Sequence, residues 1–153
     1  MNECDSKKKN REYIPMKKNK SNSNYKSKNH SKYILLYHFI FVCKYRKKLL
    51  LKYGDDIKQI MFDISKRYDF EIEEMEVDKD HIHIMISSEP KISPLQIVRT
   101  LKQQSTIKMW EMYPKELNRH YWEENTFWTD GYFVSTIGEV SAKTLQHYIQ
   151  NQG

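Results

Sequence analysis

Two histidines separated by a single residue, His81 and His83, are the side chains of this sequence best suited to bind one metal ion together. They lie in the segment 78–87, where isoleucines at every second position follow the period of a β-strand with one buried face. Residues two apart on a strand point to the same side, with their Cα atoms about 6.7 Å apart. The two imidazoles can therefore converge on a divalent ion, although a polar strand surface without a ligand has the same pattern.

The elements around this strand predict a fold that would hold it in place. The expected strands are 33–45, 70–77 and 81–87, with a turn and a fourth strand within 128–137, and the expected helices are 55–68, 93–112 and 141–152. The first six elements follow the ferredoxin-like (RRM-like) βαββαβ pattern, an α+β fold with an antiparallel sheet and here an added C-terminal helix. In that fold the first and third strands are central. The isoleucines would then lie under the helices, and the histidines on the open face.

The two helices expected to cover the sheet have different start signals. Asp55 and Asp56 would begin the first, because acidic residues favour the first turn. Ser93 followed by Pro94 and Gln96 forms an N-cap pattern for the second, which we expect to end before a proline at 114. The apolar side of this second helix is expected to comprise Leu95, Val98, Leu101, Met109 and Met112.

Three groups of side chains each have two interpretations. The glutamates of strand 70–77 could orient the histidines or protect an edge strand by their charge. The aromatic residues of the segment 115–127, which we expect to be irregular, could stack on unpaired bases or pack beneath a loop. The basic cluster after the first strand could contact phosphate or form a solvated turn. Its members are Lys44, Arg46, Lys47 and Lys48.

The positive charge of the chain is concentrated at its N-terminus. Residues 1–32 hold 10 Lys/Arg and 3 Asp/Glu, whereas the whole chain of 153 residues has a net charge of +6. Residues 1–30 are rich in Lys, Asn and Ser and poor in apolar side chains, so we expect a disordered basic tail. Such a tail attracts polyanions such as nucleic acid, although it can also act only as a solubilising segment.

The remainder, residues 31–153, has the size of a single domain. Two cysteines, Cys4 and Cys43, are too few for a disulfide framework and indicate a reducing compartment. No apolar run reaches the length of a membrane span, and the N-terminus lacks the apolar segment of a signal peptide. We therefore expect a cytoplasmic protein with no membrane partner.

The last expected helix carries two side chains that could complete a site with the histidines. Tyr148 and Gln152 are four residues apart and share one helix face. If this helix lies over the open face of the sheet, Gln152 can supply an amide oxygen as a third metal ligand and Tyr148 a nucleophile. In isolation the same pair also suits an ordinary helix surface.

Taken together, these segments resemble the single-tyrosine HUH transposases of the smallest bacterial insertion sequences, with the REP-associated tyrosine transposases as close relatives. The resemblance runs from about Tyr33 to Gln152, and the basic tail lies outside it. The motifs that carry it, in chain order, are Cys43-Lys44-Tyr45-Arg46-Lys47-Lys48, His81-Ile82-His83, Phe127–Gly138 and Tyr148-Ile149-Gln150-Asn151-Gln152.

The resemblance implies a DNA strand transferase that needs no ATP. Tyr148 would attack the scissile phosphate of single-stranded DNA and form a 5′-phosphotyrosine link, and a 3′-OH would later reseal the strand. His81 and His83, with Gln152, would hold Mg²⁺ or Mn²⁺. The family recognises hairpins at the ends of the element and is homodimeric through its sheets, and the tyrosine helix of one subunit can serve the histidines of the other.

Two other functions remain open. A non-catalytic single-stranded nucleic-acid-binding module of the same fold would use the sheet face and the tail, without a nucleophile. A metal hydrolase acting on a small molecule would need further ligands or a Gly-rich phosphate loop, neither of which is evident in the sequence.

Overall fold

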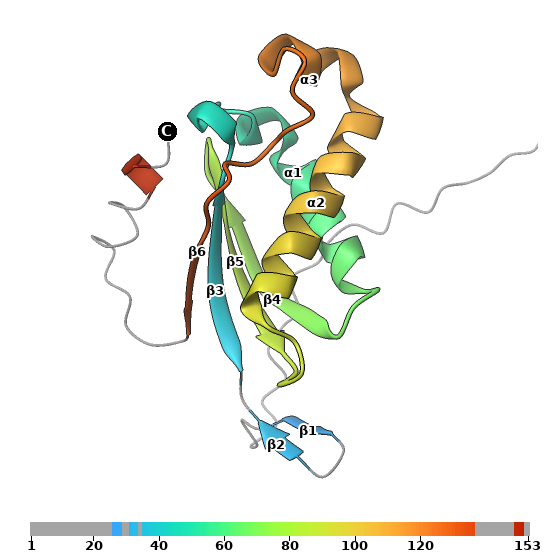
Figure 1. Ribbon diagram of the computed structural model, residues 1–153, viewed down its shortest axis with the longest axis vertical. Helices are drawn as coiled ribbons and strands as arrows, with labels where there is room; N and C mark the ends of the chain where they lie inside the picture. Colours follow the sequence, from blue (N-terminus) through green and yellow to red (C-terminus); the bar gives the residue numbers. More distant parts are fainter. Residues whose placement is uncertain (1–25, 29–30, 34, 137–148, 152–153) are drawn as a thin grey trace, which may run out of the picture.

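The computed structural model describes residues 26–28, 31–33, 35–136 and 149–151 (Figure 1). The six elements of the predicted βαββαβ order are present in β3, α1, β4, β5, α2 and β6, which confirms the predicted fold class. The bounds of the elements are β1 Lys26–Lys28, β2 Ser31–Tyr33, β3 Leu36–Val42, the 3₁₀ turn η1 Lys44–Arg46, α1 Leu50–Ser65, β4 Phe70–Val77, β5 His81–Ser88, α2 Pro94–Met112, α3 Pro114–His120 and β6 Phe133–Thr136.

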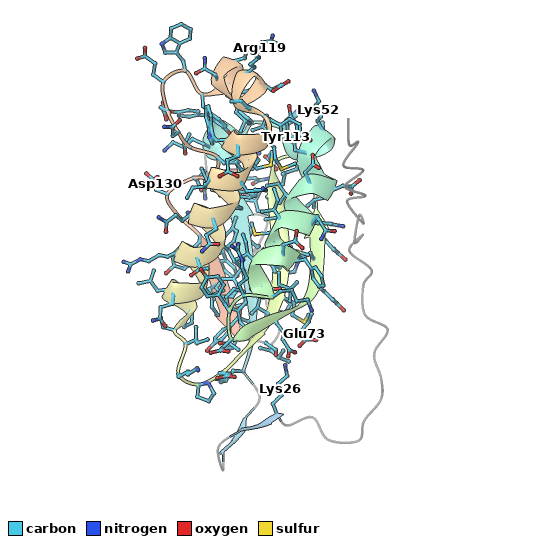
Figure 2. All side chains as sticks on the ribbon, turned by 90° about the vertical axis from the view of Figure 1, so that its right-hand side faces the viewer. Lys26, Lys52, Glu73, Tyr113, Arg119 and Asp130 are labelled. Atoms are coloured by element: carbon cyan, nitrogen blue, oxygen red, sulfur yellow. The ribbon has the colours of Figure 1, made fainter. Side chains whose placement is uncertain are left out.

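The main sheet has four antiparallel strands in the order β4-β5-β3-β6. The first and third strands of the pattern, β3 and β5, are central as predicted, and the acidic strand β4 is an edge. Helices α1 and α2 cover the same face of the sheet (Figure 1), and Figure 2 shows them side by side from that face. The alternate isoleucines of β5 are fully buried, since this face forms the core.

Helix α1 begins at Leu50, so the predicted start at Asp55 is wrong. The residues before Asp55 are helical because Leu49, Leu50 and Tyr53 are buried in the core. The Leu50 N–H also donates a hydrogen bond to the Lys79 carbonyl at 3.0 Å, which ties the helix start to the β4–β5 turn. The aspartates at 55 and 56 therefore lie inside the helix, beyond its first turn.

Helix α2 has the predicted capping box. The Ser93 hydroxyl accepts a hydrogen bond from the Gln96 N–H at 3.2 Å, and the Gln96 side chain accepts one from the Ser93 N–H at 2.9 Å. The predicted apolar side is correct for the three buried residues Val98, Leu101 and Met109. It is wrong for Leu95 and Met112, which are exposed, and it missed the buried Ile97.

The segment 115–127 is partly helical, contrary to the prediction of an irregular stretch. Pro114 does end α2, but it also begins α3, because proline suits the first turn of a helix. Leu117 on α3 and Tyr121 just after it are buried against the core. These two side chains keep the short helix packed on the domain.

A small antiparallel pair, β1 and β2, precedes the main sheet. Its Lys26 ammonium forms ion pairs with Glu71 at 2.6 Å and Glu73 at 3.6 Å. Lys26 and Glu73 are labelled in Figure 2. Strand β1 thus lies within the predicted tail 1–30, while residues 1–25 and 29–30 lie outside the described residues. None of the described helices is long and apolar enough to cross a bilayer.

Candidate active site on the open face of the sheet

His81 and His83 lie at the start of β5, on the face of the sheet opposite α1 and α2. Both side chains are partly exposed, whereas the alternating Ile82 and Ile84 are fully buried. In the register with β3, His81 is paired with Val42 and His83 with Ile40. The shared histidine face predicted from the alternation is therefore present on a central strand.

Asp80 orients the first histidine. Its Oδ1 lies 3.0 Å from His81 Nδ1, and the two side chains are only 14% and 18% exposed. A carboxylate in this position holds the proton on Nδ1 and leaves Nε2 of His81 free to bind a metal. From the sequence, the glutamates of β4 were the candidates for this role. The structure instead supplies the partner from the β4–β5 turn.

A third histidine, His38 on β3, adjoins the second. Its Nδ1 lies 2.8 Å from His83 Nε2, and the two rings are stacked with centroids 5.0 Å apart. Burial lowers the pKa of His83 below its usual value, and the nearby His38 lowers it further. The neutral imidazole is the form that binds metals. Sequence reasoning missed His38, because the run 34–43 is apolar at nearly all other positions and shows no alternation; in the structure the neighbouring Phe39 is in the core, and His38 lies on the opposite face of the strand.

The described residues include two of the three predicted metal ligands. Within them, no group of three or more His, Cys, Asp or Glu side chains could hold an ion. His81 suits the ligand role through its free Nε2, whereas His83 can bind through Nδ1 or, if its contact with His38 opens, through Nε2. The predicted third ligand Gln152 and the predicted nucleophile Tyr148 both lie outside the described residues. Imidazoles with one amide oxygen suit Mn²⁺ better than Mg²⁺, which prefers oxygen ligands.

A single turn of the last helix is described, at residues 149–151, and it lies near the histidine end of β5. The Arg46 guanidinium contacts this turn and also the residue just before β5. Its Nη1 donates to the Gln150 carbonyl at 3.3 Å, and its Nε lies 3.4 Å from Asp80 Oδ2. Figure 1 shows this turn near the end of the sheet where β3 ends and β5 begins.

The basic cluster around η1 is divided between internal contacts and solvent. Lys44 lies 3.7 Å from the Asp130 carboxylate, and Arg46 is engaged as described above. Lys47 is partly exposed and Lys48 fully exposed. Contact of these four residues with DNA remains a prediction.

The aromatic residues near α3 mostly serve the core. Tyr121, Phe127 and Trp128 are buried, and the Trp128 indole donates a hydrogen bond to the Ser105 hydroxyl at 2.9 Å. Trp122, by contrast, is 75% exposed and can contact a base. Packing beneath a loop is therefore correct for the buried rings, and stacking remains open for Trp122.

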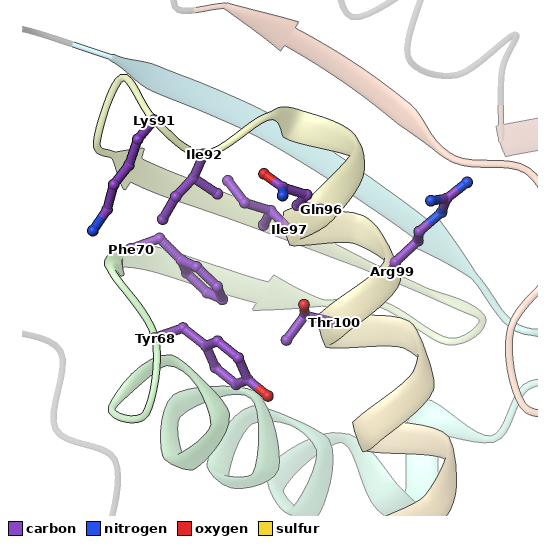
Figure 3. Close-up of a pocket in the computed structure, with 8 residues that line it drawn as sticks. All are labelled: Tyr68, Phe70, Lys91, Ile92, Gln96, Ile97, Arg99 and Thr100. Atoms are coloured by element: carbon purple, nitrogen blue, oxygen red, sulfur yellow. The ribbon is translucent and has the colours of Figure 1, made fainter.

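A pocket of about 370 Å³ lies at the opposite end of the β4–β5 hairpin (Figure 3). It opens between the start of β4 and the first turns of α2, and Phe70 on its floor pairs with Ser88, far along the hairpin from His81. The pocket is lined by Tyr68, Phe70, Lys91, Ile92, Gln96, Ile97, Arg99 and Thr100. It is separate from the histidine face.

Comparison with known proteins identifies relatives over most of the chain. The family model described as "Transposase IS200 like" matches residues 31–152. The ISDra2 transposase TnpA of Deinococcus radiodurans is 34% identical over 121 residues, covering 78% of this chain and 85% of that protein. The transposase for insertion sequence element IS200 of Salmonella typhimurium is 32% identical over 130 residues, covering 83% of this chain and 82% of that protein.

A solved structure supports the same assignment. A crystal structure of a protein from Deinococcus radiodurans R1 superposes with a TM-score of 0.76 at 30% sequence identity, and the alignment covers 83% of this chain and 97% of that one. The region matched by the family model includes the βαββαβ core, the histidine strand and the turn at residues 149–151. The chain belongs to the IS200-like transposase family.

Proposed function

We propose that this transposase cleaves and rejoins single-stranded DNA at insertion-sequence ends through a 5′-phosphotyrosine link to Tyr148, with Mg²⁺ or Mn²⁺ at His81, His83 and Gln152. The observation that carries the proposal is the pair of histidines on the open face of a central strand, one of them oriented by Asp80. The turn at residues 149–151 is held near the same end of the sheet, which favours joint action of helix and strand.

In the proposed reaction the Tyr148 phenol oxygen attacks the scissile phosphorus. A new P–O bond forms to the tyrosine, the bond to the 3′-oxygen breaks, and the phenol proton is passed to solvent while the 3′-oxygen takes up a proton. Attack by a 3′-OH on the phosphotyrosine reverses these steps and restores the tyrosine. One phosphodiester replaces another, so the strand is resealed without ATP.

The side chains of this site have separate tasks. A bound divalent ion supplies positive charge against the developing charge of the phosphate. Asp80 would hold the proton on Nδ1 of His81 and so leave Nε2 for the ion, and burial lowers the pKa of His83, which favours the neutral form that binds metals. A rigid central strand is a precise support for these ligands, because its neighbours on both sides fix its position.

The proposed partner is single-stranded DNA with hairpin ends, in the bacterial cytoplasm. Lys44, Lys47 and Lys48 would face its phosphates near the site, and the basic tail would add affinity that depends on salt. We also propose a homodimer. In that dimer the tyrosine helix would serve the histidines of its own subunit or those of the partner.

The reaction is tested by incubating the chain with single-stranded element-end DNA and Mn²⁺ and looking for a covalent adduct on a denaturing gel. We expect an adduct with the wild-type chain and none with Tyr148→Phe or with the His81→Ala/His83→Ala double variant. Tyr68→Phe and His120→Ala are matched controls, since Tyr68 lines the distant pocket and His120 is exposed at the end of α3. Both controls should form the adduct.

The outcomes separate the two candidate functions. An adduct that persists in Tyr148→Phe would remove that residue as the nucleophile. Binding by the wild-type chain in chelator, with no adduct at any metal concentration, would indicate a non-catalytic binding module instead. Use in cis or in trans is tested by mixing Tyr148→Phe chains with His81→Ala/His83→Ala chains, and adduct formation in the mixture would contradict use in cis.

A further inference from the structure

One carboxylate serves both a histidine of the site and an arginine. Asp80 places Oδ1 3.0 Å from His81 Nδ1 and Oδ2 3.4 Å from Arg46 Nε. The Asp80 side chain is largely buried, so water competes weakly for either oxygen. Any movement of Arg46 therefore acts on the group that orients His81.

A second nitrogen of the Arg46 guanidinium contacts the described turn of the last helix. Arg46 Nη1 donates to the Gln150 carbonyl at 3.3 Å, across 104 residues of sequence. Gln150 lies two residues after Tyr148. The contacts thus run from His81 through Asp80 and Arg46 to the backbone of the turn at residues 149–151, which follows Tyr148 directly in the sequence.

The backbone at Arg46 is unusual for a residue with a side chain. Tyr45 and Arg46 are consecutive residues in the left-handed region, with φ values of 59° and 52°. Glycine adopts this conformation more easily, and strained residues of this kind persist only where their surroundings hold them. Here the Arg46 N–H donates to the Cys43 carbonyl at 2.8 Å, and the Tyr45 hydroxyl donates to Glu124 at 2.7 Å. A fixed turn therefore presents the Arg46 side chain.

We propose that Arg46 is a positioning residue that ties the last helix to Asp80 and so sets the place of Tyr148 relative to His81. The inference rests on the proposed function. It adds a contact that connects the last helix, which would supply Tyr148, to the strand that carries the histidines. Its physical basis is the rigid, planar guanidinium, whose separate nitrogens Nε and Nη1 reach the carboxylate and the carbonyl in a fixed geometry, whereas a lysine offers all its donors from one atom on a flexible stem. Small misplacements of a nucleophile cost about a hundredfold in rate.

The competing role for Arg46 is direct contact with DNA phosphate, and the two roles affect different quantities. A phosphate contact contributes to affinity and is largely retained by Lys, which keeps the charge. A positioning contact contributes to the rate at saturating DNA and does not survive replacement by Lys. The test therefore measures the DNA dissociation constant and the single-turnover rate of adduct formation separately.

We expect Arg46→Lys to leave the dissociation constant within about twofold and to lower the saturated rate by about 10- to 100-fold. Asp80→Asn should also lower the rate, and the double variant should lose less than the product of the two single losses, because the residues act through one another. Arg119→Lys is the matched control. It makes the same substitution at an exposed arginine in the last turn of α3, outside the proposed site, so it should leave the saturated rate unchanged.

A second measurement does not depend on activity. In ¹⁵N NMR spectra of the full chain, the Arg46 Nε–H signal should exchange slowly with water and should shift in Asp80→Asn. A rapidly exchanging Arg46 signal, or an unchanged saturated rate in Arg46→Lys, would overturn the inference while the wild-type adduct stands. Absence of the wild-type adduct would instead overturn the proposed function and, with it, the positioning role.

Discussion

Cys43 is a single residue that contacts both the hydrophobic core and the backbone of Asp80 beside the candidate site. It is fully buried at the end of β3, and its N–H donates to the Asp80 carbonyl at 2.7 Å. Burial raises the pKa of its thiol, and the negative charge of Asp80 raises it further. The thiolate, which is the reactive form, is therefore scarce in the folded protein.

The resulting prediction concerns thiol reactivity. In a Cys4→Ser variant, the remaining thiol should react with Ellman's reagent at least about tenfold more slowly than a free cysteine at neutral pH. It should react at the normal rate in denaturant, and the absorbance of the released product measures both. A fast reaction under native conditions would contradict the burial of Cys43.

Sequence patterns predict some individual roles and miss others for a definite reason. Alternation placed His81 and His83 on one face because it depends only on neighbours along the strand. The contact of His38 with His83 depends on the register between β3 and β5, and the bond of Asp80 to His81 depends on the shape of a turn. Register and turn geometry are set by packing between distant segments, which a single sequence does not reveal.

At the scale of elements, Lys102 holds the segment that leads into β6. Its ammonium donates hydrogen bonds to the carbonyls of Thr129, Asp130 and Gly131 at 2.5, 3.1 and 3.0 Å. Burial lowers the pKa of Lys102, and the nearby Asp130 partly opposes this effect. The lysine thereby joins the middle of α2 to the chain just before the edge strand.

We therefore predict that Lys102→Met lowers the free energy of unfolding by about 1–3 kcal/mol, since it leaves partly buried carbonyls without their donor. Urea denaturation followed by circular dichroism measures the change. Lys108→Met on the same helix is the control. It removes only an exposed ion pair with Glu111 at 3.5 Å and should change stability by less than about 0.5 kcal/mol. Equal effects of the two substitutions would contradict the structural role of Lys102.

Tyr113 joins the corner between α2 and α3 to helix α1. Its hydroxyl donates to the Asp56 carboxylate at 2.7 Å, and its ring centroid lies 4.6 Å from that of Tyr53. The hydrogen bond to Asp56 is the main reason that its pKa rises from 10.0 to about 12. Between these two values the folded chain keeps the proton that the unfolded chain loses, so the stabilisation is complete below the lower value and declines as the pH rises.

The prediction is that the stability difference between the wild type and Tyr113→Phe shrinks from about pH 9 to about pH 11. Urea denaturation of both chains at each pH measures this difference. Tyr68→Phe, which changes a tyrosine near the distant pocket, serves as the control for general alkaline effects. A difference that stays constant over this range would contradict the Tyr113–Asp56 bond.

The errors in the predicted elements share one cause. The start of α1 was placed at the acidic residues, whereas burial of Leu50 and Tyr53 extends the helix toward the N-terminus. Helix α3 was missed because Pro114 is both a stop for one helix and a start for the next. Element order was predictable because long periodic segments determine it, but boundaries depend on tertiary packing.

At the scale of the whole molecule, the fold brings distant parts of the sequence to one end of the sheet. The end of β3, the start of β5 and the turn at residues 149–151 meet around Arg46 and Asp80. The pocket beside Tyr68 lies at the other end of the hairpin. Helices α1 and α2 occupy one face of the sheet, and the histidines lie on the opposite face. The candidate site and the hydrophobic core are therefore on different sides of the sheet.

The basic N-terminal segment is expected to contribute outside this site. Residues 1–25 contain 7 Lys/Arg and 3 Asp/Glu, and a cut after residue 25 retains Lys26 with its ion pairs to the acidic edge strand. If the segment binds DNA only through charge, deleting it should remove phosphate contacts without altering the geometry around His81. The deletion should then change the affinity for DNA without changing the rate of adduct formation at saturating DNA.

We predict that deletion of residues 1–25 weakens binding to single-stranded DNA at low salt and flattens the slope of log affinity against log salt by about 0.7 for each phosphate that the segment neutralises. Fluorescence anisotropy across a salt series measures this slope. A full-length chain with the seven basic residues of the segment changed to Gln should show the same slope, because the effect arises from charge rather than length. The rate of adduct formation at saturating DNA should equal that of the wild type. An unchanged slope would show that the segment does not contact DNA, whereas a lower saturated rate would place it at the active site.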